Sequence, residues 1–69
     1  MIRLRVHIKL AECEMNQKDL TELTGITKNT VTAYAKNTFK FIGRDHLDKM
    51  CKVFKCSVSD LIEYKDDEN

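Results

Sequence analysis

The sequence predicts a single all-α domain over residues 1–69, a compact set of five short helices with a possible short strand at the N-terminus. Apolar residues recur three or four positions apart along much of the chain, which is the spacing of a buried helix face. The chain contains two glycines and no proline, so little interrupts its helices. A hydrophobic content of 42% and a charged content of 33% are typical of a globular protein. So small a core is only just sufficient, and oligomerisation is a common way to add to it.

The centre of the chain has the pattern of two short helices, at about 17–24 and 28–36, separated by Gly25. Glycine readily adopts the left-handed conformation that ends a helix. Asn16 and Thr27 precede the two helices, where their side chains can accept a hydrogen bond from a free backbone N–H. We expect the apolar residues of the pair to face inward, namely Leu20, Leu23, Ile26, Val31 and Tyr34. Residues 16–36 therefore have the pattern of a helix-turn-helix.

The outer face of the second helix is expected to carry short polar or cationic side chains and no carboxylate. These residues are Lys28, Asn29, Thr32, Ala33 and Lys36. Asparagine can form two hydrogen bonds with adenine, lysine can reach the acceptors of guanine, and an alanine methyl can contact thymine. This surface is suited to the edges of DNA bases.

Flanking segments complete the expected fold. Ile2, Leu4 and Val6 alternate with polar residues, which predicts a short strand. Its expected partner is the segment 62–65, although the same strand of a second protomer is an alternative. The spacing then changes to that of a helix over about 6–14.

The second half of the chain is expected to form two more helices and a short tail. A helix beginning near residue 43 or 44 has a complete inward stripe of Leu47, Met50, Cys51 and Phe54. Ser57 and Asp60 resemble a capping box that opens the last helix. That helix should direct three apolar residues inward, Val58, Leu61 and Ile62. Residues 65–69 form a short acidic tail that we expect to fray.

The loop from Asn37 to Gly43 contains two phenylalanines. In the simpler interpretation, Ile42 and one phenylalanine fold back onto the core. In the alternative, Phe39 or Phe41 projects at a dimer contact or against the sugar–phosphate wall of DNA. The sequence does not decide the role of either ring.

The charges are unevenly distributed along the chain. The net charge of the protein is +1, but residues 27–44 carry four cations and no acid, and residues 45–69 carry a net charge of −3. The four cations are Lys28, Lys36, Lys40 and Arg44. Such a segment can offset phosphate charge, while the acidic end limits non-specific binding. A solvated lysine face is the alternative interpretation.

Other function classes fit the sequence poorly. It has no glycine-rich phosphate loop, zinc-protease motif or nucleophile elbow, so we expect no enzyme, no cofactor and no small-molecule substrate. Cys13, Cys51 and Cys56 are expected to be core or half-buried thiols. A zinc site is not expected, because His46 and Cys51 would point about 140° apart on one helix. No apolar run approaches a membrane span and no leader is visible, so we expect a cytoplasmic protein.

Two stretches resemble the lambda-repressor/Cro (XRE-type) helix-turn-helix family. These are NQKDLTELTGITKNTVTAYAKN and LDKMCKVFKCSVSDLIEY, and the resemblance covers about residues 4–64. It is closest to small stand-alone members from bacteria and prophages. The resemblance implies a five-helix lambda-repressor-like domain that binds double-stranded DNA through the major groove. It also implies a two-fold homodimer and a role in transcriptional control.

The resemblance assigns contacts to individual residues. Gln17 matches a position where the family often places a glutamine against the DNA backbone. Thr27, Lys28 and Asn29 match the start of the recognition helix, and Thr30 matches a phosphate-facing position. We therefore expect these five residues to bind DNA.

The later part of the recognition helix extends this expected site. Thr32, Ala33 and Lys36 match its groove-facing flank. Lys36, Lys40 and Arg44 lie towards or beyond the end of the helix, so phosphate contacts suit them better than base contacts. The chain has AKNT at 35–38, where many family members have Glu-Asn-Gly. This departure leaves the exit from the helix open.

The leading hypothesis is a sequence-specific DNA-binding regulator, a repressor that acts as a homodimer on a two-fold operator. The alternative is a protein-interaction module on the same fold, such as an antitoxin or a phage antirepressor partner. The uninterrupted positive segment from Lys28 to Arg44 favours DNA.

Overall fold

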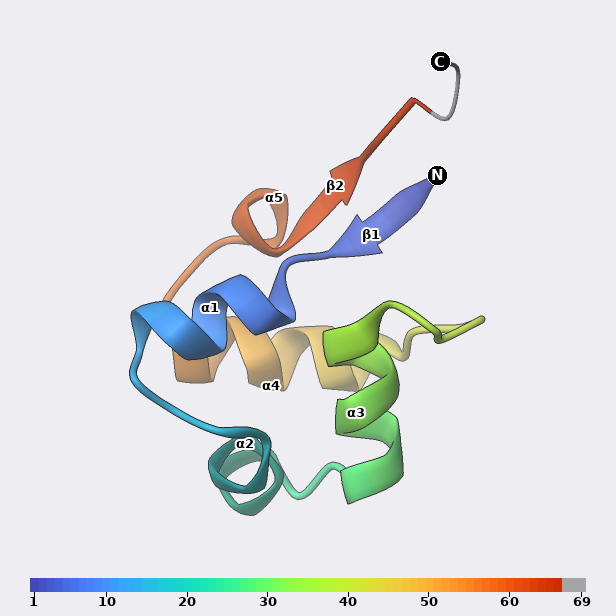
Figure 1. Ribbon diagram of the computed structural model, residues 1–69. Helices are drawn as coiled ribbons and strands as arrows, with labels where there is room; N and C mark the ends of the chain where they lie inside the picture. The colour runs from blue at the N-terminus through green and yellow to red at the C-terminus, as the bar shows by residue number, and fades with distance from the viewer. Residues whose placement is uncertain (67–69) are drawn as a thin grey trace.

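The computed structural model describes residues 1–66 and contains five helices joined to a small two-stranded sheet (Figure 1). This confirms the predicted fold class. In chain order the elements are β1 (Ile2–Leu4), α1 (Val6–Glu12), α2 (Gln17–Thr24), α3 (Lys28–Lys36), α4 (Arg44–Phe54), α5 (Val58–Leu61) and β2 (Ile62–Tyr64). The expected acidic tail lies mostly outside the described residues.

The core lies where α1, α2, α3 and α4 meet. Its most deeply buried side chains come from almost every element and are Leu4, Val6, Leu20, Val31, Met50 and Leu61. Ile26 and Tyr34 are also buried, as the inward pattern of the helix pair predicts. Burying such apolar side chains is the main force that holds α3 against α2 and α1.

The sheet joins the two ends of the described chain. β1 pairs antiparallel with β2, with Arg3 opposite Glu63 at the centre of the register. The strand predicted at residues 2–6 is therefore confirmed over Ile2–Leu4, and its partner is the segment at the other end of the same chain. The Arg5 N–H donates to the Leu61 carbonyl at 2.8 Å, which connects β1 to the end of α5.

The first helix of the helix-turn-helix begins and ends as predicted. Asn16 accepts a hydrogen bond from the Asp19 N–H at 2.8 Å, and Asp19 accepts one from the Asn16 N–H at 3.1 Å. Gly25 ends α2 in the left-handed region at φ 77°. Thr24 is buried and supports the same turn, because its hydroxyl donates to the Leu20 carbonyl and accepts from the Ile26 N–H.

Two residues predicted to face inward do not. Leu23 is 62% exposed, because the buried face of α2 is centred between Leu20 and Thr24 and Leu23 points about 80° away from it. Val58 is 50% exposed, since α5 is a single turn that directs only Leu61 into the core. The assumption that every apolar residue faces inward is therefore wrong.

Three smaller expectations are also corrected. Thr27 does not cap α3 with its side chain, because its hydroxyl donates to the Thr30 hydroxyl at 2.9 Å. The first helix ends at Glu12 instead of 14, since Glu14 adopts a left-handed conformation at φ 55°. Cys13 is exposed in this turn, whereas Cys51 and Cys56 are half-buried as expected.

Candidate nucleic-acid interface

One hydrogen bond connects the start of α2 to the middle of α3. The Thr32 hydroxyl donates to Gln17 Oε1 at 2.8 Å. The structure therefore brings together two predicted site residues that lie 15 positions apart in the chain. Because Oε1 accepts this bond, the amide nitrogen of Gln17 is left as a donor for a group outside the protein.

α3 has an outer face like the predicted one. Lys28, Asn29 and Lys36 are exposed, while Thr32 and Ala33 are half-buried at the edge of the same face. The opposite side of the helix is buried through Val31, Tyr34 and Ala35. Since side chains on one helix diverge by about 100° per residue, packing of the inner stripe fixes the direction of the outer one.

The predicted cations are not neutralised within residues 1–66. The ion pairs there join Lys9 to Glu12 and Lys52 to Asp48, both away from α3. None of the four predicted cations takes part in these pairs. An unpaired lysine on an exposed helix keeps its charge available for an anion.

Lys18 is a further cation at this surface that the charge pattern did not indicate. It lines a pocket of about 260 Å³ together with Thr21 and Lys28. The Thr21 hydroxyl oxygen is buried and has no hydrogen-bond partner within the described chain. The net charge of each segment did not indicate Lys18, because the acids in residues 1–26 balance the cations there.

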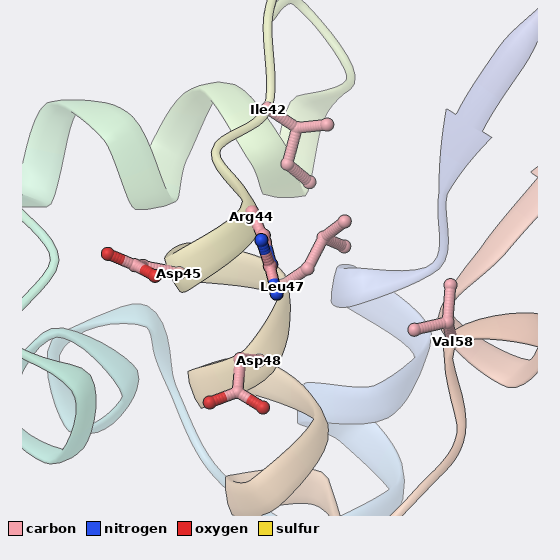
Figure 2. Close-up of a pocket in the computed structure, with 6 residues that line it drawn as sticks. All are labelled: Ile42, Arg44, Asp45, Leu47, Asp48 and Val58. Carbon is pink, nitrogen blue, oxygen red and sulfur yellow. The ribbon is translucent and has the colours of Figure 1, made fainter.

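Arg44 lies in different surroundings from the α3 residues. It lines a groove of about 640 Å³ at the start of α4, together with acidic residues and apolar side chains (Figure 2). The other lining residues are Ile42, Asp45, Leu47, Asp48 and Val58. Arg44 therefore differs from the predicted α3 contacts, because it lines this groove at the start of α4 and they do not.

The aromatic loop after α3 contains one packed ring and one free ring. Phe39 packs edge-on against Tyr34, with ring centroids 5.6 Å apart, and Ile42 packs against the core. The Tyr34 hydroxyl also lies 2.7 Å from His46 Nδ1 on α4. Phe41 projects and is 87% exposed. The simpler interpretation is thus confirmed for Phe39 and Ile42. A role for Phe41 at a dimer contact or against DNA stays a prediction.

Asn37 determines the exit from α3. It adopts the left-handed conformation at φ 59°, which a glycine usually fills at a helix end. Its side-chain amide donates to the Leu4 carbonyl at 3.1 Å and accepts from the Leu4 N–H at 2.6 Å. α3 is thereby attached to β1. The residue type is one signal for this conformation, since asparagine tolerates left-handed geometry better than most residues.

Within 1–66, no group of three or more His, Cys, Asp or Glu side chains is placed to hold a metal ion. No helix there is long and apolar enough to cross a membrane.

Comparisons with known proteins also indicate a DNA-binding domain. The model of the Cro/C1-type HTH DNA-binding domain matches residues 5–67. The chain is 29% identical over 68 residues to YozG, an uncharacterized HTH-type transcriptional regulator of Bacillus subtilis, and the match covers 99% of this chain and 81% of YozG. It also resembles the crystal structure of a protein from Bacteroides fragilis proposed to bind DNA. That match has a TM-score of 0.81 and 25% identity, and covers 91% of this chain and 100% of the other.

Proposed function

Since the chain belongs to the Cro/C1-type helix-turn-helix DNA-binding family, we propose that it is a transcriptional repressor that inserts α3 into the major groove of a specific operator. The observation that carries this proposal is the outer face of α3. Lys28, Asn29 and Lys36 are exposed there, the face has no acid, and its cations form no ion pair within the described residues. A regulator of this kind works where the bacterial chromosome lies, in the cytoplasm, and needs no catalysis.

We assign the base contacts to the first turns of α3. Asn29 can donate to and accept from the major-groove edge of adenine, and Lys28 can donate to guanine. Ala33 lies one turn further along the same side, where its methyl group can contact a thymine methyl. Half-burial of Ala33 restricts that contact to a close approach of the helix to the groove.

Phosphate contacts position the helix. Gln17 is held by Thr32 with its amide nitrogen still available, which suits a phosphate oxygen at the edge of the groove. Thr27 and Thr30 present hydroxyls at the start of α3, and Lys18 adds a cation at the pocket that it lines with Lys28. The remaining candidates for phosphate contacts lie later in the chain and are Lys36, Lys40 and Arg44.

A homodimer would place two copies of α3 on successive major grooves, roughly 34 Å apart. The candidate dimer surface is the groove in Figure 2 together with the exposed ring of Phe41, the residue that precedes the groove-lining Ile42. Ile42, Leu47 and Val58 give this groove an apolar lining, and in a two-fold contact each copy can supply both a ring and a groove. Phe41→Ser should convert dimers to monomers in sedimentation equilibrium while leaving the helix content unchanged. Equal association of the variant and the parent would rule out this surface.

Repression then follows from occupancy, because a bound dimer covers promoter DNA that RNA polymerase must contact. Selection of sites from random duplexes tests specificity first. An enriched site with two-fold symmetry is expected. A reporter controlled by that site should be less active when the protein is present, and increased activity would contradict repression.

Two variants separate base contacts from phosphate contacts. Asn29→Ala should weaken binding to the selected site by about 1–3 kcal/mol and leave binding to random duplex almost unchanged. Lys36→Ala should weaken binding to both duplexes alike. It should also reduce the slope of log K against log salt concentration by about one, because one phosphate contact is lost. Gel shifts at rising salt measure both effects. If neither variant differs from the parent, the site assignment is wrong, and failure of the parent to bind at low salt would favour the protein-interaction alternative.

A further inference from the structure

Two thiols meet where α4 ends. The helix stops at Lys55, which adopts the left-handed conformation at φ 55° and ψ 48°. This turn carries the chain back, so that the Cys56 N–H donates to the Cys51 carbonyl at 3.1 Å. In this type of helix end, the side chains of the two residues so joined frequently contact each other. The backbone bond brings Cys51 and Cys56 close together, and a disulfide requires Cα atoms about 4.4–6.8 Å apart.

The surroundings of the pair are partly apolar but open to small molecules. Both thiols are free and half-buried, and both pack against the hydrophobic core. Burial raises the pKa of the Cys51 thiol, and the neighbouring Cys56 thiol raises it further. Cys13, by contrast, is exposed on the turn after α1 and provides an internal reference.

We propose that Cys51 and Cys56 are a reversible redox site, in which a two-electron oxidant of the peroxide or disulfide class converts the two thiols into one intramolecular disulfide. The bridge would join the end of α4 to the turn before α5, the helix that leads into β2. In reducing compartments, disulfides are typically transient and redox-sensing, which is the behaviour expected of this pair.

The chemistry balances with hydrogen peroxide as the oxidant. The Cys56 sulfur attacks one peroxide oxygen, the O–O bond breaks, and a sulfenic acid and one water form. The Cys51 sulfur then attacks the Cys56 sulfur, the S–O bond breaks, and a second water leaves with the Cys51 proton. Two thiols are oxidised and one peroxide is reduced. Thiols such as dithiothreitol reverse the reaction by exchange.

The experiment uses the whole chain with Cys13→Ser, so that only the pair remains. Treatment with dilute hydrogen peroxide, or with glutathione disulfide, should remove both free thiols together. Intact mass should fall by two hydrogens in a monomeric product, and dithiothreitol should restore both thiols. Peptide mapping without reduction should recover the segments of Cys51 and Cys56 as one linked species.

Two further variants make the assignment specific. Cys51→Ser and Cys56→Ser should each abolish the product that lacks two hydrogens. The remaining thiol should then form a mixed disulfide with glutathione, as Cys13 does in the parent. Independent modification of the two thiols in the Cys13→Ser protein, or a disulfide between two chains, would overturn the proposal. Figure 1 places the end of α4 away from α3, so operator binding tests the proposed function separately.

Discussion

Replacing Asn37 with glycine separates two roles of this residue. One role is the left-handed backbone at the end of α3, and the other is the pair of hydrogen bonds with Leu4. Glycine accepts the same backbone without steric cost but has no side chain to bond β1. The sign of the stability change therefore shows which role dominates.

The expected change is a loss of stability. Leu4 is 1% exposed and its N–H and carbonyl both rely on the Asn37 amide, so removing the amide should cost about 1 kcal/mol for each of the two bonds. Relief of the left-handed backbone is worth about 1 kcal/mol at most for asparagine, and the greater flexibility of unfolded glycine offsets much of it. The net loss is about 1–2 kcal/mol, which corresponds to roughly 7–14 °C in Tm for a domain of this size.

Lys55 provides a matched control. It ends α4 in nearly the same backbone conformation, at φ 55° and ψ 48°, and its side chain is exposed. Lys55→Gly should therefore stabilise the protein by about 0.5–1 kcal/mol, because only the steric cost is removed. Thermal and urea unfolding followed by circular dichroism measure both variants. If Asn37→Gly and Lys55→Gly change stability in the same direction, the hydrogen bonds to Leu4 do not hold α3 to β1 as argued.

Three other predictions use single substitutions or simple chemistry. Thr24→Val should lower the free energy of urea unfolding by about 1–2 kcal/mol, since the buried hydroxyl makes two hydrogen bonds and valine makes none; an unchanged midpoint would contradict this. Gln17→Ala should weaken binding to cognate and random duplexes equally in gel shifts, while a selective loss on one base pair would indicate base reading instead. Cys51 should be alkylated by iodoacetamide more slowly than Cys13 at about pH 8, as followed by peptide mass spectrometry, because burial raises the pKa of Cys51 and leaves less reactive thiolate. Equal rates would argue against that shift.

Local signals were enough to predict the helices. Asn16, Gly25 and the stripe that ends in Phe54 depend on neighbours within one or two turns, and all three have the predicted role. Leu23 and Val58 were misplaced because their exposure depends on where other helices pack, which periodicity within one helix cannot specify. Helix spacing predicts a stripe but not the centre of its buried part.

In the candidate site, too, the local features could be predicted and the contacts between distant residues could not. The outer face of α3 could be read from the sequence, because the alternation of buried and exposed residues along one helix is local. The bond from Thr32 to Gln17 spans 15 residues and the bonds from Asn37 to Leu4 span 33, and neither contact leaves a periodic signal. Lys18 was missed because a sum over sequence mixes residues that lie on different faces.

The contacts that the sequence did not predict share one physical effect, because they fix α3 along its length. Thr24 holds the turn before the helix, the Gln17 bond holds its middle, and Asn37 attaches its end to the sheet. A recognition helix that is rigid before binding loses less conformational entropy when its side chains meet the bases. If α3 reads DNA as proposed, the small sheet contributes to that recognition through Asn37, although no DNA contact is assigned to the sheet. On this reasoning Asn37→Gly should lower the operator affinity of the folded protein, in addition to lowering the fraction that is folded. If the folded variant and the folded parent bind the operator equally well, rigidity at this end of α3 is not needed.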